Sequence, residues 1–246
     1  MMMDQRIFYA AGTSAALDQA VHQLKRYAIP FTRTPDRSVT HLLLPAPCRE
    51  DMSELMKKLS LDVTVIGGKL DRPEFFGYRC IDLLEDEGYL CQNAAITAHC
   101  ALQVAAQRLP ITLEDCPILV IGWGRIGKCL SALLRQSGSQ VSIAARKEKD
   151  RAMIRALGYE AEDPQHLDNI LRCYRAIFNT VPEPILSQDQ LAQCRPDCLK
   201  IELASKPGLI GDDVIQALGL PSKMAPESSG KLIARSVLRM LAQKEV

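Results

Sequence analysis

Three glycines in one short segment have the spacing needed to hold a phosphate-bearing ligand. Gly122, Gly124 and Gly127 follow the apolar run 117–121 and precede a stretch in which apolar residues recur at helical spacing. A strand, a G-x-G-x-x-G loop and a helix in this order are the fingerprint of a dinucleotide site. The first glycine permits a tight turn, the second admits the pyrophosphate, and the third lets the helix pack on the strand. N–H groups at the helix start then face the phosphates.

The residues after the next expected strand, 141–144, indicate which dinucleotide is bound. NAD sites place Asp or Glu about 20 residues after the glycine loop, where it binds the ribose 2′-hydroxyl. Here Ala145, Arg146 and Lys147 stand instead. A guanidinium presents a forked pair of donors that suits a 2′-phosphate. The pattern therefore predicts NADP, with a solvated basic turn as the alternative.

Two further segments follow apolar runs and should lie at the same edge of the sheet. Segment 179–182 reads Asn-Thr-Val-Pro, and segment 203–208 reads Leu-Ala-Ser-Lys-Pro-Gly. Ligands of open α/β sheets bind at the carboxyl ends of the strands, so we expect Ser205 and Lys206 near the nicotinamide, although a Lys-Pro-Gly loop is also an ordinary turn. The predicted cofactor-binding residues are Gly122, Trp123, Gly124, Arg125, Ile126, Gly127, Ala145, Arg146, Lys147, Asn179, Thr180, Val181, Pro182, Leu203 and Ala204.

The elements that position these residues alternate between strand and helix patterns, which indicates an α/β fold. We expect a doubly wound parallel (Rossmann) sheet and a smaller N-terminal flavodoxin-like α/β domain. The expected strands are 6–10, 41–44, 63–66, 118–121, 141–144, 176–178 and 199–203, and the expected helices are 14–27, 51–59, 93–107, 125–136, 150–157, 164–173, 188–194 and 227–244. Asn93 and Asp163 are the expected N-caps of two of these helices.

The expected domain organisation has four parts. Residues 1–92 form the substrate-side domain, 93–110 a connecting helix, 111–226 the NADP domain, and 227–246 a helix that packs back on the N-terminal domain.

Composition excludes several classes of function. Thirty Lys and Arg oppose 29 Asp and Glu, so the net charge of +1 gives no general attraction to nucleic acid or anionic membrane. No apolar run approaches the roughly 20 residues that span a bilayer. The nine scattered cysteines suit free thiols in the cytoplasm. Cys194 and Cys198 lack further nearby ligands, so no metal site is predicted.

Together these motifs resemble the A subunit of bacterial dipicolinate synthase. The match covers roughly residues 75–242, and the same lobe more distantly resembles 2-hydroxyacid and shikimate dehydrogenases. The segments that carry the resemblance are 93–97, 110–113, 120–125, 144–146, 178–182, 202–208, and 225–226 with Gly230.

The resemblance implies an NADP-dependent oxidation of a dehydrated hydroxy-tetrahydrodipicolinate to dipicolinate. This reaction uses a lysine-pathway intermediate, serves sporulation and involves a separate flavoprotein-like B subunit. Lys206 and His99 are the candidate catalytic residues, with Asn93, Thr97, Ser205 and Lys206 as candidate substrate ligands. The ligand would be a small cyclic or dicarboxylate metabolite, and we expect a homo-oligomer.

Two departures from the family pattern favour a different class of function. The family carries Gly-Gly-Asp after its first strand, whereas this chain has Ala-Ala-Gly at 10–12. Where the family has Glu-Gly on the connecting helix, this chain has His99 and Cys100. The alternative is therefore a regulatory or scaffold subunit that binds NADP(H) without turnover.

Overall fold

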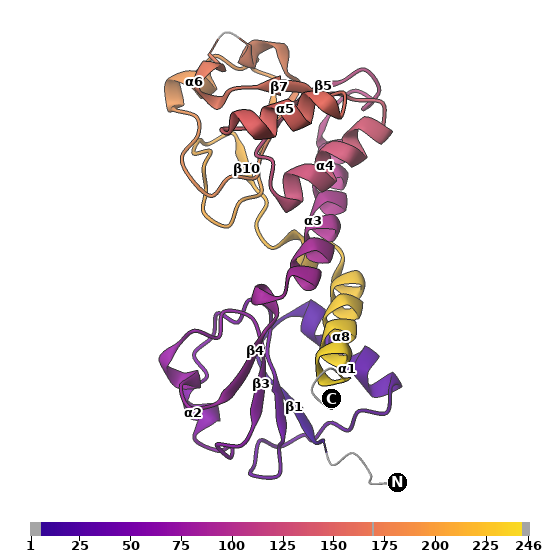
Figure 1. Ribbon diagram of the computed structural model, residues 1–246, viewed down its shortest axis with the longest axis vertical. Coiled ribbons are helices and arrows are strands. Elements are labelled where there is room, and N and C mark those ends of the chain that lie inside the picture. Colours follow the sequence, from indigo (N-terminus) through magenta and orange to yellow (C-terminus); the bar gives the residue numbers. More distant parts are fainter. Residues whose placement is uncertain (1–5, 169, 243–246) are drawn as a thin grey trace. The chain divides into compact units, whose positions relative to one another are not determined.

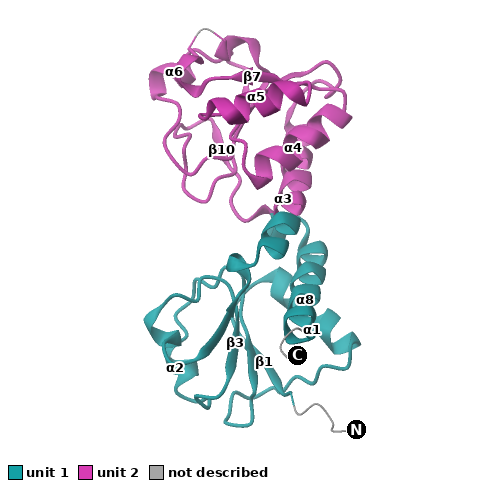
Figure 2. Cartoon of the chain, viewed as in Figure 1, with its two compact units in different colours: residues 1–93, 221–246 teal, residues 94–220 magenta. Residues whose placement is uncertain are grey.

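The computed structural model describes residues 6–168 and 170–242 (Figure 1). The chain divides into two compact units, one formed by residues 1–93 with 221–246 and the other by 94–220 (Figure 2). Each unit contains its own parallel β-sheet. Within the described ranges, no helix combines the length and the apolar character required to cross a membrane.

The first unit is built on a four-stranded parallel sheet in the order β1-β2-β3-β4. Leu42 pairs with Val65 across β2 and β3, and both side chains are buried. They pack in one core with Met52 and Met56. The strands are β1 (Phe8–Ala10), β2 (His41–Leu43), β3 (Thr64–Gly67) and β4 (Arg79–Asp82). A smaller N-terminal α/β unit is thus confirmed, but β1 lies at the edge of the sheet, so a flavodoxin-like order with the first strand inside is not observed.

Two long helices of this unit pack against each other (Figure 1). Helix α1 (Ala15–Arg26) begins at Ser14, whose side chain accepts a hydrogen bond from Leu17 N. Helix α8 (Pro226–Ala242) approaches it closely because Gly230 has no side chain: a Cβ there would lie 2.4 Å from Gln19 Cβ. The shorter elements are α2 (Ser53–Met56), the 3₁₀ turns Pro73–Phe75 and Leu83–Glu85, and α7 (Leu220–Met224), which straddles the boundary between units.

The second unit contains a six-stranded parallel sheet in the order β10-β9-β8-β5-β6-β7. Numbered along this unit and read from β7, the order is 3-2-1-4-5-6, the doubly wound arrangement of a Rossmann sheet. The predicted α/β fold class is therefore confirmed. The strands are β5 (Pro117–Ile121), β6 (Gln140–Ala144), β7 (Glu160–Glu162), β8 (Ala176–Asn179), β9 (Leu199–Glu202) and β10 (Val214–Gln216).

The central strands of this sheet are buried on both faces, which explains their continuous apolar runs. Leu119, Ile121 and Ile177 pack in one core with Leu191. The helices of the unit are α4 (Arg125–Gln136), α5 (Glu148–Ala156) and α6 (Gln188–Ala192), with 3₁₀ turns at Pro164–His166 and Leu171–Cys173, and α3 (Glu87–Arg108) enters it from the first unit.

Two expected helices differ from the observed ones. The expected helix 164–173 is replaced by the two 3₁₀ turns, although Asp163 does cap the first of them by accepting from Gln165 N at 3.0 Å. Asn93 is not an N-cap, because α3 starts six residues earlier, at Glu87. Asp86 caps it instead, its Oδ1 accepting from Tyr89 N at 2.6 Å.

The other differences are at element ends and sheet edges. Strands β4, β7 and β10 were not expected. The expected helices 51–59 and 188–194 are shortened to α2 and α6. Residues 243 and 244 of the expected C-terminal helix lie outside the described residues.

Candidate nucleotide site

The glycine loop after β5 is compact on one side and open on the other. Gly122 has φ +109°, and a Cβ there would lie 2.3 Å from Thr180 Oγ1. A Cβ at Gly127 would lie 2.1 Å from Gly122 O, so the start of α4 can approach the loop only without a side chain. A Cβ at Gly124 would meet nothing within 4 Å. The open side at Gly124 leaves room for a ligand at the start of α4, where phosphate binds in this type of loop.

A cavity of about 340 Å³ opens beside this loop. Its size lies within the range of small-molecule sites, roughly 300–1,000 Å³. Predicted cofactor residues in the lining are Gly122, Trp123, Gly124, Ala145, Arg146, Lys147, Val181 and Pro182. The remaining lining residues are Ile121, Ala144, Asp150, Pro164, Glu183 and Ile185. The fold thus brings three separate predicted segments to one cavity at the carboxyl ends of β5, β6 and β8.

The cavity carries charges of both signs. Arg146 and Lys147 follow β6, and both line it. Glu183, from the loop after β8, lies with its Oε2 3.5 Å from Arg146 Nη1, and both side chains are well exposed. An exposed pair of this kind contributes little stability. Arg146 is thus held near the cavity by a weak partner that an incoming phosphate can replace.

Trp123 lines the cavity and lies among side chains from α4 and from the turn before β7. Its ring meets that of Tyr159 edge-on at 6.3 Å, and Lys128 Nζ lies 5.6 Å from its centre. Arg135 lies over the Tyr159 ring, with its Cζ 4.9 Å from the ring centre. The indole is therefore fixed by packing, which suits the predicted role beside a cofactor.

The other seven predicted cofactor residues do not line the cavity, and several of them are buried in the segments that end beside it. Thr180 Oγ1 donates to Ile121 O at 2.9 Å, which fixes the loop after β8 against the end of β5. Gly127 is packed against the loop, and Asn179, Leu203 and Ala204 are buried. Arg125 and Ile126 begin α4.

A buried carboxylate missing from the predicted site residues, Glu202, holds the strand ends together. Its Oε1 accepts from Ala204 N at 2.7 Å, and its Oε2 accepts from Gly208 N and Leu209 N at 2.8 and 2.7 Å. Asn179 Nδ2 donates to both oxygens. The only signal in the sequence is an acid between Ile201 and Leu203, within an apolar strand.

This network shapes the loop that carries the predicted substrate residues. Ser205 and Lys206 are both exposed, between the anchored residues Ala204 and Gly208. Neither lines the nucleotide cavity. Their exposure at the carboxyl end of β9 leaves the hydroxyl and the ammonium accessible to a ligand.

The remaining predicted substrate residues lie on α3. Asn93 is half-buried, Thr97 is buried and His99 is exposed. Residues two apart on a helix point about 200° apart, so Thr97 and His99 face different sides of α3. Substrate contact by Asn93 and Thr97 and catalysis by His99 stay predictions.

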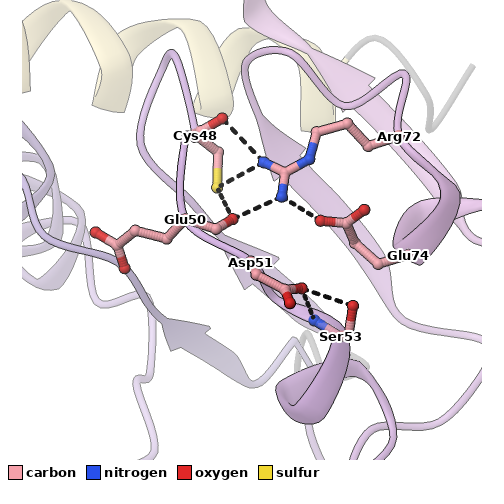
Figure 3. Close-up of polar contacts among 6 residues, drawn as sticks. All are labelled: Cys48, Glu50, Asp51, Ser53, Arg72 and Glu74. Carbon is pink, nitrogen blue, oxygen red and sulfur yellow. Dashed lines mark hydrogen bonds and ion pairs between the residues drawn. The ribbon is translucent and has the colours of Figure 1, made fainter.

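In the first unit, Arg72 ties together the loops that follow β2 and β3 (Figure 3). Its guanidinium donates to Cys48 O at 3.1 Å and to Glu50 O at 2.7 Å, and it pairs with Glu74. Burial raises the pKa of the Cys48 thiol, an effect that Arg72 partly opposes. A buried, protonated thiol is a poor nucleophile, so we interpret this cluster as one that stabilises the two loops.

Comparisons with known proteins agree with this fold. No family model matches the sequence. Solved structures that share the fold include a transhydrogenase from Sinorhizobium meliloti, with a TM-score of 0.76, 11% identity and coverage of 97% of this chain and 94% of that one. Other similar structures are dehydrogenases. Fold and glycine loop together define a doubly wound Rossmann-type architecture.

The A subunit of dipicolinate synthase is similar to this chain in both sequence and fold, as the motifs predicted. The Bacillus halodurans structure superposes with a TM-score of 0.86 at 20% identity, covering 98% of this chain and 99% of that one. The Bacillus subtilis protein is 27% identical over 177 residues, which are 67% of this chain and 58% of that protein.

A glutamyl-tRNA reductase from Helicobacter hepaticus is 25% identical over 171 residues, which are 67% of this chain and 39% of that protein. The chain therefore matches little more than half the length of one curated relative and less than half of the other.

Proposed function

We propose that this chain is an NADP-dependent oxidoreductase. The observation that carries the proposal is the cavity in which the glycine loop faces Arg146 and Lys147, with no acid directly after β6. The fit is supported by the open side of Gly124, where a pyrophosphate has room. A bound nicotinamide supplies the hydride acceptor or donor. The residues of the chain bind and orient the cofactor and the substrate, and they exclude competing reactions.

The proposed substrate is a small cyclic dicarboxylate of the kind that dipicolinate synthase oxidises. Similarity to the A subunit of that enzyme supports this choice. In the overall reaction a hydroxylated tetrahydropyridine loses water, one ring carbon of the product then gives a hydride to the nicotinamide, and a second ring position gives a proton to a base. Lys206, exposed on an anchored loop, is proposed to bind one carboxylate, with Ser205 donating beside it.

His99 is proposed as the proton acceptor, since imidazole titrates near neutral pH. Asn93 and Thr97 are proposed to hydrogen-bond the substrate ring. The proposal also includes a flavoprotein-like second subunit and assembly of this chain into a homo-oligomer. It further includes a cytoplasmic location and a role in sporulation through the lysine pathway.

A second candidate function is a regulatory or scaffold subunit that binds NADP(H) without turnover. It is favoured by His99 and Cys100 on α3, where the family pattern has Glu-Gly, and by the exposure of His99 on a different side of the helix from Thr97. In this candidate function the chain still binds the nucleotide but does not catalyse a reaction.

The experiment that separates the two candidates is an oxidation assay. Purified protein is mixed with NADP⁺, a hydroxylated tetrahydropyridine dicarboxylate and the candidate partner subunit. Enzyme function predicts the rise of pyridine absorbance in step with reduced nicotinamide, and a large loss of rate in Lys206→Ala. Tight NADPH binding with no product, from this compound or from a panel of hydroxy acids and cyclic imines, would favour the regulatory subunit.

A further inference from the structure

Arg151 on α5 turns its charged group inward, toward the backbone of the loop after β6. Its Nη1 donates to Ala145 O at 2.8 Å and to Arg146 O at 3.0 Å. The side chain is only 15% exposed, whereas that of Arg146 is 76% exposed. Two neighbouring carbonyls are thus held by one planar guanidinium, while the side chain of Arg146 is exposed and has the exposed Glu183 as its partner.

Two carboxylates also lie against the Arg151 guanidinium. Glu148 Oε2 accepts from Nε at 2.9 Å and lies 2.8 Å from Nη2. Asp163 Oδ2 lies 2.9 Å from Nη1, and Asp163 is itself fixed as the cap of the turn that begins at Pro164. With its donors directed at carbonyls and carboxylates, Arg151 is not arranged as a phosphate ligand.

Backbone hydrogen bonds at the start of α5 also hold the loop at 145–147. Lys147 O accepts from Asp150 N at 2.9 Å and from Arg151 N at 3.1 Å, so the last loop residue is also the start of the helix. On the other side, Ala145 N donates to Glu162 O at 3.1 Å. The loop at 145–147 is therefore bonded through its backbone on both sides, and the side chains of Arg146 and Lys147 line the cavity.

From this geometry we infer that Arg151 is a positioning residue for cofactor specificity, which holds the loop at 145–147 in the shape that directs Arg146 and Lys147 at a 2′-phosphate. The inference rests on the proposed NADP site and deepens it. Because the 2′-phosphate distinguishes NADPH from NADH, the effect of Arg151 falls on the ratio of the two affinities. A general loss of folding would weaken both cofactors together.

The test compares dissociation constants for NADPH and NADH in wild type, Arg151→Lys and Arg155→Lys. Lysine keeps the positive charge at 151 but cannot fork between two carbonyls and two carboxylates. Arg155 is the matched control, because it lies one turn later on α5 and its guanidinium bonds to the same Glu148 rather than to the loop. Thermal unfolding of each variant reports on the integrity of the fold.

We expect Arg151→Lys to weaken NADPH about tenfold, the size of one lost charge-assisted contact, and NADH less than about twofold. Arg155→Lys should leave the ratio unchanged. The inference is overturned if Arg151→Lys keeps the wild-type ratio, or if both variants lower it equally. If wild type itself shows no preference for NADPH, the proposed NADP site fails first, and this inference fails with it.

Should Arg151→Lys unfold, Asp163→Asn provides the second variant. It removes one of the carboxylates that hold the guanidinium and leaves Arg151 in place. The same selective loss of NADPH is expected, to a smaller extent, and an unchanged ratio would contradict the inference.

Discussion

Asn179 donates through one nitrogen, Nδ2, to both carboxylate oxygens of Glu202, at 3.0 and 2.8 Å. The two residues end neighbouring strands, β8 and β9, and both are fully buried. Three backbone N–H groups complete the shell around the carboxylate. One acid thus joins the strand end beside the nucleotide cavity to the loop that presents Lys206.

The first prediction follows from this network. Glu202→Gln should lower the free energy of unfolding by about 2–3 kcal/mol, the cost of an unsatisfied buried polar group. Each carboxylate oxygen accepts from at least two N–H donors, so either orientation of an amide sets N–H against N–H. Urea denaturation measures the loss, with the exposed Glu183→Gln as control. Equal stability of Glu202→Gln and wild type would contradict this view of the network.

The second prediction separates two glycines of the same loop. Gly127→Ala should cost about 2–3 kcal/mol of stability, because its Cβ would lie 2.1 Å from Gly122 O. Gly124→Ala should cost about 1 kcal/mol or less, through the weaker N-cap. Yet Gly124→Ala should weaken NADPH at least about tenfold, since the methyl group enters the space proposed for the pyrophosphate. Thermal unfolding and NADPH titration measure the two effects, and unimpaired binding by Gly124→Ala would place the pyrophosphate elsewhere.

The third prediction concerns the charges around the cavity. Arg146→Asp should weaken NADPH by about 10- to 100-fold and NADH much less, because a charge-assisted contact contributes about 1.5–3 kcal/mol. Glu183→Gln should have the opposite sign and strengthen NADPH slightly, since Arg146 loses a competing partner. Fluorescence titration with each cofactor gives the ratios. Equal losses for NADPH and NADH in Arg146→Asp would show that Arg146 does not bind the 2′-phosphate.

The fourth prediction is a pH profile. The hydrogen bond from Cys198 lowers the pKa of the Cys194 thiol below its ordinary value, and the pKa of Cys198 is raised in return. Since the thiolate is the reacting form, alkylation at Cys194 should increase with pH over a range below that of an ordinary thiol. Cys198→Ala should move the midpoint upward. Peptide mass spectrometry after iodoacetamide gives the rates, and an unmoved midpoint would mean that Cys198 is not the cause.

Local patterns were enough to predict the part of the fold around the glycine loop. Helix α4 was expected at 125–136 and runs from Arg125 to Gln136, because its apolar spacing and the glycines at either end are all close in sequence. The edge strands β4, β7 and β10 escaped prediction because they are only three or four residues long and partly exposed. Such strands have no apolar run to mark them.

Contacts between distant residues could not be predicted in the same way. The carboxylate of Glu202 is bound by N–H groups of a loop that folds back on it. It is also bound by Asn179, which lies 23 positions earlier. The start of α3 was missed because Gly88 follows its first residue, and glycine disfavours a helix. A contact distant in sequence holds the residue before α3, because Arg239 of α8 donates to Asp86 at 2.6 Å.

The most direct test of the central claim is calorimetric titration of the wild-type chain with NADPH and, separately, with NADH. The cavity between the glycine loop and Arg146 predicts one site per chain and at least about tenfold tighter binding of NADPH. Equal or tighter binding of NADH, or no heat from either cofactor, would contradict the assignment of an NADP site.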